Sequence, residues 1–200
     1  MKYSINIMAA MAALAVTMLF AGCSAVTTPY PLSTQSKPVD KERFEGTWQG
    51  GEGTVSVRFA SNGVARLAGA EWKDEQFRLI QGEMIVAEGK KDNFISVRFE
   101  ENGAWTNRYF FLQYKFTDNG DLILWGPNID EFEAAIRSGM LQGVVTKKKN
   151  TTSISVTNAP GELLDFMNDP ERRTLFNYRE PMVLRKIAAP DTSAPGAGEH

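Results

Sequence analysis

Residues 54–67 read TVSVRFASNGVARL and carry the clearest structural signal in the chain. Val55, Val57 and Phe59 alternate with polar residues, which is the period-2 pattern of a half-buried strand. The Asn62-Gly63 pair that follows is a strong short-range hairpin signal, because both residues tolerate the backbone angles of tight turns. The stretch is therefore predicted to form two antiparallel strands joined by a short turn.

The same pattern recurs further along the chain. Residues 94–99 alternate before Asn102-Gly103, and residues 106–116 form a long predicted strand before Asn119-Gly120. Gln81-Gly82, between two apolar runs, is interpreted as another hairpin turn. Six further apolar runs are predicted strands: residues 77–80, 84–87, 122–125, 144–147, 153–156 and 181–187. So many consecutive antiparallel strands must close or stack to remove their edges.

Two segments follow a helical period instead. Ile129, Phe132, Ile136 and Met140 share one helical face, and Asn128 is placed to cap that helix. A second helical stretch is predicted over residues 160–176. The sequence therefore predicts a mainly β fold, an antiparallel barrel of about eight to ten strands with two short helical inserts.

The N-terminal residues have the layout of a secretion signal. Lys2 precedes an apolar run over residues 5–20, and Ala21-Gly22 place small residues before Cys23. This ending resembles a bacterial lipobox, which implies a signal peptide over residues 1–22 and lipidation of Cys23. Ser24 then points to the outer membrane, facing the periplasm, if the source is Gram-negative. An uncleaved membrane-spanning helix and an ordinary cleavage site are the alternatives.

Composition divides the remaining chain into three parts. Residues 23–40 are rich in Ser, Thr and Pro, and the prediction is a lipidated Cys followed by a flexible tether. Residues 41–187 are predicted to form one β-barrel-like domain. Residues 188–200 are rich in Ala, Pro and Gly and are predicted to be a disordered tail.

Residue counts restrict the chemistry. The chain has one Cys and one His, His200, so it cannot form an internal disulfide or a thiolate metal cluster, and a Ser-His-Asp triad is not expected. We expect no metal and no cofactor. The acid and base candidates are scattered carboxylates: Glu71, Glu83, Asp92 and Glu162. We therefore expect the protein not to be an enzyme.

The charge balance bears on partners. A net charge of -2 gives no electrostatic signature for nucleic acid. The single basic run, residues 147–149, is interpreted as a solvated strand end. The expected membrane partner is reached through the lipid anchor.

Gly46-Thr47-Trp48 precedes the first strong strand, and Arg185 lies in the last. In these residues the domain resembles the lipocalin and wider calycin group. The resemblance implies that the first and last strands are neighbours and that the Arg185 guanidinium covers the Trp48 indole at the closed end of a barrel. Without it, Trp48 is a core aromatic residue and Arg185 faces solvent.

Phe110, Leu112, Tyr114 and Phe116 share one face of the predicted long strand. They either line a ligand cavity or fill a small barrel core. The predicted function is a membrane-anchored periplasmic lipoprotein that binds a small apolar ligand or a partner. A structural or assembly lipoprotein of an envelope complex is the alternative, and an enzyme without His or Cys chemistry is the third.

Overall fold

The computed structural model describes residues 24–33, 40–51, 53–73, 75–89, 91–101, 103–172 and 174–187. The predicted signal peptide, Cys23 and the tail at 188–200 lie outside the described residues. Within the described part the chain is mainly β, with twelve strands and three short helices. Eight of the strands close into an antiparallel barrel, so the predicted fold class is confirmed.

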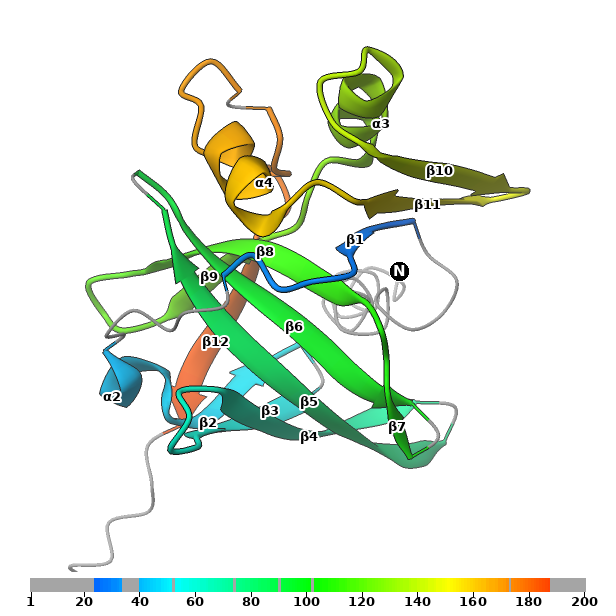
Figure 1. The fold of residues 1–200 in the computed structure, drawn as a ribbon. Helices are drawn as coiled ribbons and strands as arrows, with labels where there is room; N and C mark the ends of the chain where they lie inside the picture. The colour runs from blue at the N-terminus through cyan, green and yellow to red at the C-terminus, as the bar shows by residue number, and fades with distance from the viewer. Residues whose placement is uncertain are drawn as a thin grey trace, which may run out of the picture.

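The barrel closes by a continuous ring of antiparallel pairings, visible in Figure 1. Its strands, in order around the ring, are β2 (Gly46–Gly50), β3 (Gly53–Phe59), β4 (Ala65–Lys73), β5 (Gln76–Glu88), β6 (Asn93–Glu101), β8 (Tyr109–Phe116), β9 (Leu122–Trp125) and β12 (Met182–Ile187). β12 pairs with β2 and completes the ring. A closed ring leaves no unpaired edge along these strands. The short β7 (Ala104–Trp105) pairs only with the end of β6.

Strand alternation fills the barrel interior. On β6, Ile95 and Val97 point inward, while Phe94 and Ser96 point outward. Two predicted turns have the expected backbone, because Gly63 and Gly120 take φ angles of 81° and 84°. On β3, β6 and β8 the period-2 pattern therefore predicted the side that faces the barrel interior.

One predicted hairpin is wrong. Gln81-Gly82 is not a turn, because β5 runs unbroken from Gln76 to Glu88 and the chain reverses between β4 and β5 instead. Gly82 is there for packing: a Cβ would lie 3.1 Å from the Arg98 carbonyl oxygen and 3.2 Å from a ring carbon of Phe99. A glycine in a strand marks a close approach as often as it marks a turn.

The predicted bounds match the observed helix in one case and not in the other. α3 (Ile129–Arg137) starts as expected, with the Asn128 side chain accepting a hydrogen bond from the Asp130 amide at 3.2 Å. The second, α4 (Pro160–Met167), ends well before residue 176. A third helix, α2 (Lys41–Phe44), was not predicted. None of the helices in the described part is long and apolar enough to cross a membrane.

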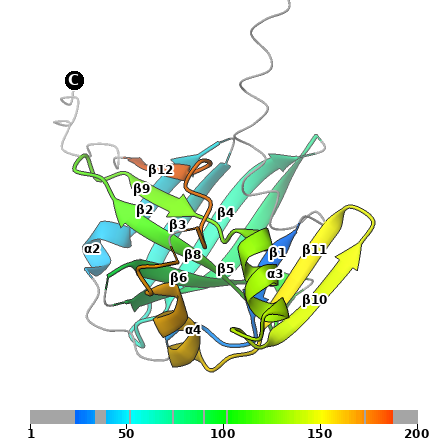
Figure 2. The ribbon, with the colours of Figure 1, turned by 90° about the horizontal axis from the view of Figure 1, so that it is seen from above.

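A second layer covers the outer faces of β6 and β8. It consists of α3, α4, β1 (Ala25–Thr28), β10 (Gly143–Lys148) and β11 (Thr151–Val156), and Figures 1 and 2 show it on one side of the barrel. Outward-facing Phe94 and Phe111 pack there against Phe176 and Phe132, with ring centroids 5.6 Å apart in each pair. The protein thus has two apolar cores, one inside the barrel and one outside it.

The predicted flexible tether is wrong for residues 24–33. β1 pairs in parallel with β11 and antiparallel with β8, so the fold includes residues upstream of Lys41. Val26 and Leu32 are 1% and 2% exposed, and the Leu32 amide donates to Ser96 Oγ at 3.0 Å. Ser/Thr/Pro-rich composition is typical of linkers. Here the burial of two apolar side chains is enough to fix the segment against β8 and β11.

We therefore expect a chain starting at Asp40 to be less stable than one starting at Ser24. Burial of Val26 and Leu32 contributes about 3–6 kcal/mol together. Urea unfolding of the two chains measures the difference. Tyr30→Ala is the control within the same segment, because Tyr30 is 58% exposed and its loss should change little. Equal stability of the two chains would show that the segment is not part of the folded unit.

Candidate functional site

Trp48 and α2 close one end of the barrel. Trp48 is 1% exposed, and its indole Nε1–H donates to the Phe44 carbonyl oxygen at 2.7 Å. Lys186 covers this end, with Nζ 5.5 Å from the centroid of the Trp48 ring and donating to the Glu42 carbonyl oxygen at 2.8 Å. Gly46 leaves room for that lysine, since a Cβ there would lie 2.7 Å from Lys186 Cε. The end is sealed by a cation over an indole.

The expected partner of Trp48 needs correction. The first and last barrel strands do pair, as the resemblance implies, but Lys186 stands opposite Trp48 and Arg185 stands opposite Gln49. Directly paired residues share a face, and successive residues point to opposite faces. Arg185 is therefore on the outer surface, where it is exposed. The cation over Trp48 comes from the adjacent residue, so the predicted Arg185 contact is wrong by one position.

The four predicted ligand-facing residues of β8 share the interior face but have different neighbours. Tyr114 and Phe116 pack against Phe44 at the closed end, with ring centroids 5.2 and 4.9 Å away. Phe110 packs against Phe99, with centroids 6.0 Å apart. Leu112 is the member of this group that lines the barrel cavity. Three of the four are core residues.

The interior cavity has a volume of about 130 Å³. Every one of the eight barrel strands contributes to its lining, together with Phe44 of α2. Thr54 is the single polar side chain among the lining residues. Burial also raises the pKa of the nearby Tyr114 phenol to about 12, so this group stays uncharged at neutral pH. The cavity therefore offers apolar contacts and no charge.

Glycines border the end of the cavity away from α2. Gly50 and Gly53 flank the β2–β3 turn, and Gly69 lies opposite Val55 on β4. Side chains at Gly50 and Gly69 have no space, since a Cβ would meet Leu184 Cδ2 at 2.3 Å and the Thr54 carbonyl oxygen at 2.7 Å. Sequence reasoning did not identify these residues, although the run Gly50-Gly51-Glu52-Gly53 was visible. Their lack of side chains leaves this end less obstructed than the α2 end.

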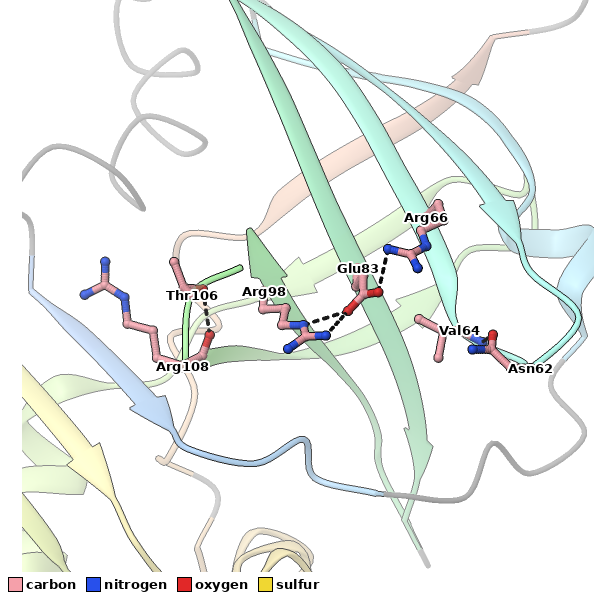
Figure 3. Close-up of polar contacts among 7 residues, drawn as sticks. All are labelled: Asn62, Val64, Arg66, Glu83, Arg98, Thr106 and Arg108. Carbon is pink, nitrogen blue, oxygen red and sulfur yellow. Dashed lines mark hydrogen bonds and ion pairs between the residues drawn. The ribbon is translucent and has the colours of Figure 1, made fainter. Parts of the chain in front are cut away.

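The buried carboxylate of the barrel wall lies outside the cavity. Figure 3 shows Glu83 between Arg66 and Arg98, with ion-pair distances of 2.5 Å to each. Glu83 faces outward from β5 and is 7% exposed. The Arg98 guanidinium also lies 5.2 Å from the Trp105 ring centroid, which holds β7 against β6. This carboxylate is paired on both sides, and we interpret the cluster as a brace between strands.

Asp92 and Glu162, two of the other carboxylates considered from the sequence, have hydrogen-bond partners elsewhere in the described part of the chain. Asp92 precedes β6 and its amide donates to Asn168 Oδ1 at 3.2 Å, while Glu162 accepts from Asn158 Nδ2 at 3.3 Å in α4. Across the described ranges, no group of three or more His, Cys, Asp or Glu residues is arranged to hold a metal ion. The cavity is thus the candidate site with the most consistent chemistry.

Comparison with known proteins adds no family assignment. No family model matches the sequence, and neither the curated proteins nor the solved structures contain a significant match.

Proposed function

We propose that this protein is a lipid-anchored envelope protein whose barrel binds a slender apolar ligand. The observation that carries the proposal is the apolar cavity of about 130 Å³, which residues from all eight barrel strands line. An apolar cavity of roughly 150 Å³ admits a molecule the size of benzene. The size and the apolar lining of this cavity therefore favour a binding role.

The size of the cavity restricts the ligand. Pockets that enclose drug-sized molecules have volumes of roughly 300–1,000 Å³, well above this one. A sterol or a haem does not fit without rearrangement of the barrel. The end of a single acyl chain does, because it is narrow and needs no polar partner. We therefore propose a fatty acid or one chain of a lipid as the ligand class.

The envelope location rests on the sequence. Residues 1–23 have the layout of a lipoprotein signal ending in a lipidated cysteine, and Ser24 at the next position favours the outer membrane in Gram-negative bacteria. A barrel that binds acyl chains and is anchored at a membrane surface lies next to the lipids that supply its ligand. The proposal is for binding rather than catalysis, because the buried carboxylate Glu83 already pairs with two arginines.

Val55→Phe tests the site by filling the cavity. Gly69 is the register partner of Val55 and has no side chain, so a phenyl ring at position 55 has space to occupy. A cross-strand aromatic residue over glycine is tolerated in sheets. We expect binding of a brominated fatty acid, measured by quenching of tryptophan emission, to weaken about tenfold or more, since each 1.4 kcal/mol of lost contact gives a factor of ten.

Ile123→Phe is the matched control. It adds the same ring on β9, between the inward-facing Leu122 and Leu124, and so points out of the barrel. Binding to this variant should equal wild type. Absence of quenching in the wild type, or equal weakening in both variants, would contradict an apolar ligand site inside the barrel.

A docking role in an envelope assembly is the second candidate, because one surface observation favours it. Phe77 and Leu79, outward on β5, are 75% and 83% exposed, and Trp72 beside them is 49% exposed. Phe77 and Trp72 stack edge to face with centroids 4.8 Å apart. Contiguous exposed apolar groups mark interaction sites. If the wild-type barrel binds no apolar ligand in the titration above, this hairpin is the feature that supports the alternative.

A further inference from the structure

The start of the fold is fixed to the tip of the β10–β11 hairpin. Ala25 pairs in parallel with Ser153, and the Thr152 amide donates to Ser24 Oγ at 2.8 Å. Because β1 and β11 run in parallel, the chain leads from Ala25 back toward the hairpin tip. Figures 1 and 2 show β1 beside β11, and in Figure 1 the β10–β11 hairpin extends beyond β1.

Cys23 lies outside the described residues, but it directly precedes Ser24. Consecutive Cα atoms are about 3.8 Å apart, so the cysteine must lie within one residue of this hydrogen bond. The predicted tether of residues 23–40 would instead separate the anchor from the domain by about 23 Å on average. The proposed acylation site is therefore one peptide bond away from a residue that is hydrogen-bonded to the hairpin.

The hairpin tip is basic. Lys147, Lys148 and Lys149 lie at the end of β10, and all three are exposed. Lys147 Nζ lies 2.8 Å from Glu133 Oε1, and Arg137 also pairs with this carboxylate. The hydrogen bond from Lys147 and the charge of Arg137 hold the pKa of Glu133 below its usual value, so the group is ionised at neutral pH. Glu133 is thus the single carboxylate in a group with four cations, namely Arg137 and the three lysines of the tip.

Lys148 and Lys149 have no carboxylate within ion-pair distance among the residues that the structure describes. Charges interact strongly with a membrane surface only within about one Debye length, about 8 Å at physiological salt. A flexible tether would keep the lysines beyond that range for most of the time. The pairing of β1 with β11 replaces such a tether with a fixed connection between Ser24 and the hairpin.

We propose that the β10–β11 hairpin tip binds the anionic headgroups of the phospholipids around the acylated Cys23. The inference rests on the lipid anchoring proposed above and adds a second, electrostatic contact. Each lysine held near an anionic bilayer strengthens attraction about fivefold. Together with the acyl chains, the tip fixes which side of the domain faces the bilayer. The lysine run is thus a headgroup-binding element rather than a solvated strand end.

The test uses the full, lipidated protein in liposomes, either neutral phosphatidylcholine or a mixture with about 30% phosphatidylglycerol. The sequence has one cysteine, which the anchor occupies, so Asn150→Cys supplies a unique thiol for a fluorophore at the tip. A nitroxide on the lipid headgroup reports proximity by quenching. Asn119→Cys, exposed in the β8–β9 turn, is the reference position.

We expect quenching at position 150 to exceed that at 119 by about twofold or more in anionic vesicles, and to fall in neutral vesicles or at high salt. Lys148→Glu with Lys149→Glu should abolish the difference. Arg58→Glu with Arg185→Glu, an equal charge change on the outer barrel wall, should retain it. A protein that floats with the liposomes but shows equal quenching at both positions overturns the inference alone. A protein that does not float overturns the lipid anchor and the inference with it.

Discussion

Cys23→Ala is expected to abolish acylation and to leave the protein in an unprocessed or a soluble form. The acyl chains proposed on Cys23 contribute about 0.8 kcal/mol per buried methylene, so two or three chains hold a protein firmly where one chain holds it only marginally. Labelling of cells with a palmitate analogue, followed by fractionation, measures both the modification and the location.

Ser24→Ala is the matched control for this change. It leaves the cysteine in place and removes only the hydroxyl that accepts the Thr152 amide. This variant should still be acylated and still fractionate with the membrane. A Cys23→Ala protein that labels and sediments like wild type would refute the lipoprotein interpretation, whatever the barrel binds.

Trp48→Ala is expected to lower the free energy of unfolding by about 3–5 kcal/mol. The indole is 1% exposed, its N–H pairs with the Phe44 carbonyl oxygen, and its loss enlarges a cavity that is already present. The barrel cannot collapse into that space, because strands on all sides are held by continuous pairing. Urea unfolding followed by far-UV circular dichroism gives the measurement.

Trp72→Ala supplies the comparison for the same substitution on the surface. Trp72 is 49% exposed and contacts Phe77 as an edge-to-face pair, so its loss should cost about 1 kcal/mol. Equal destabilisation by the two substitutions would mean that the packing of Trp48 does not stabilise the closed end of the barrel. A small loss at Trp48 with retained ligand binding would equally contradict the interior described above.

The strands could be predicted because their signal is local. Val55, Val57 and Phe59 alternate in sequence and lie together on the interior face, and Gly63 takes the positive φ that its Asn-Gly pair indicates. Gln81-Gly82 carried a similar local signal, but the turn predicted there does not form. A glycine is needed at position 82 because Phe99 and Arg98 on the neighbouring strand leave no room for a Cβ.

The contact between Lys186 and Trp48 shows what sequence pattern cannot predict about strand register. The pairing of the first and last barrel strands was implied by the resemblance carried by Gly46, Trp48 and Arg185. Arg185 and Lys186 are adjacent cations, and only the register with β2 determines which of them faces the indole. A shift of one residue moves a side chain to the opposite face of a strand. Sequence pattern alone does not fix that shift in a short strand with apolar residues on both faces.

The sequence by itself determined the β class and the hairpin turns at Gly63 and Gly120, because alternation and Asn-Gly pairs are read from neighbouring residues, and its signal layout predicts an anchor at Cys23. Only the tertiary structure decided that residues 24–33 belong to the fold and that Ser24 lies beside the hairpin that carries the lysine run of residues 147–149. Parallel pairing of β1 with β11 joins residues that are 128 positions apart, as in the bond between Ser24 and Thr152. Such pairing depends on a sheet edge assembled from distant segments, and composition carries no information about that edge.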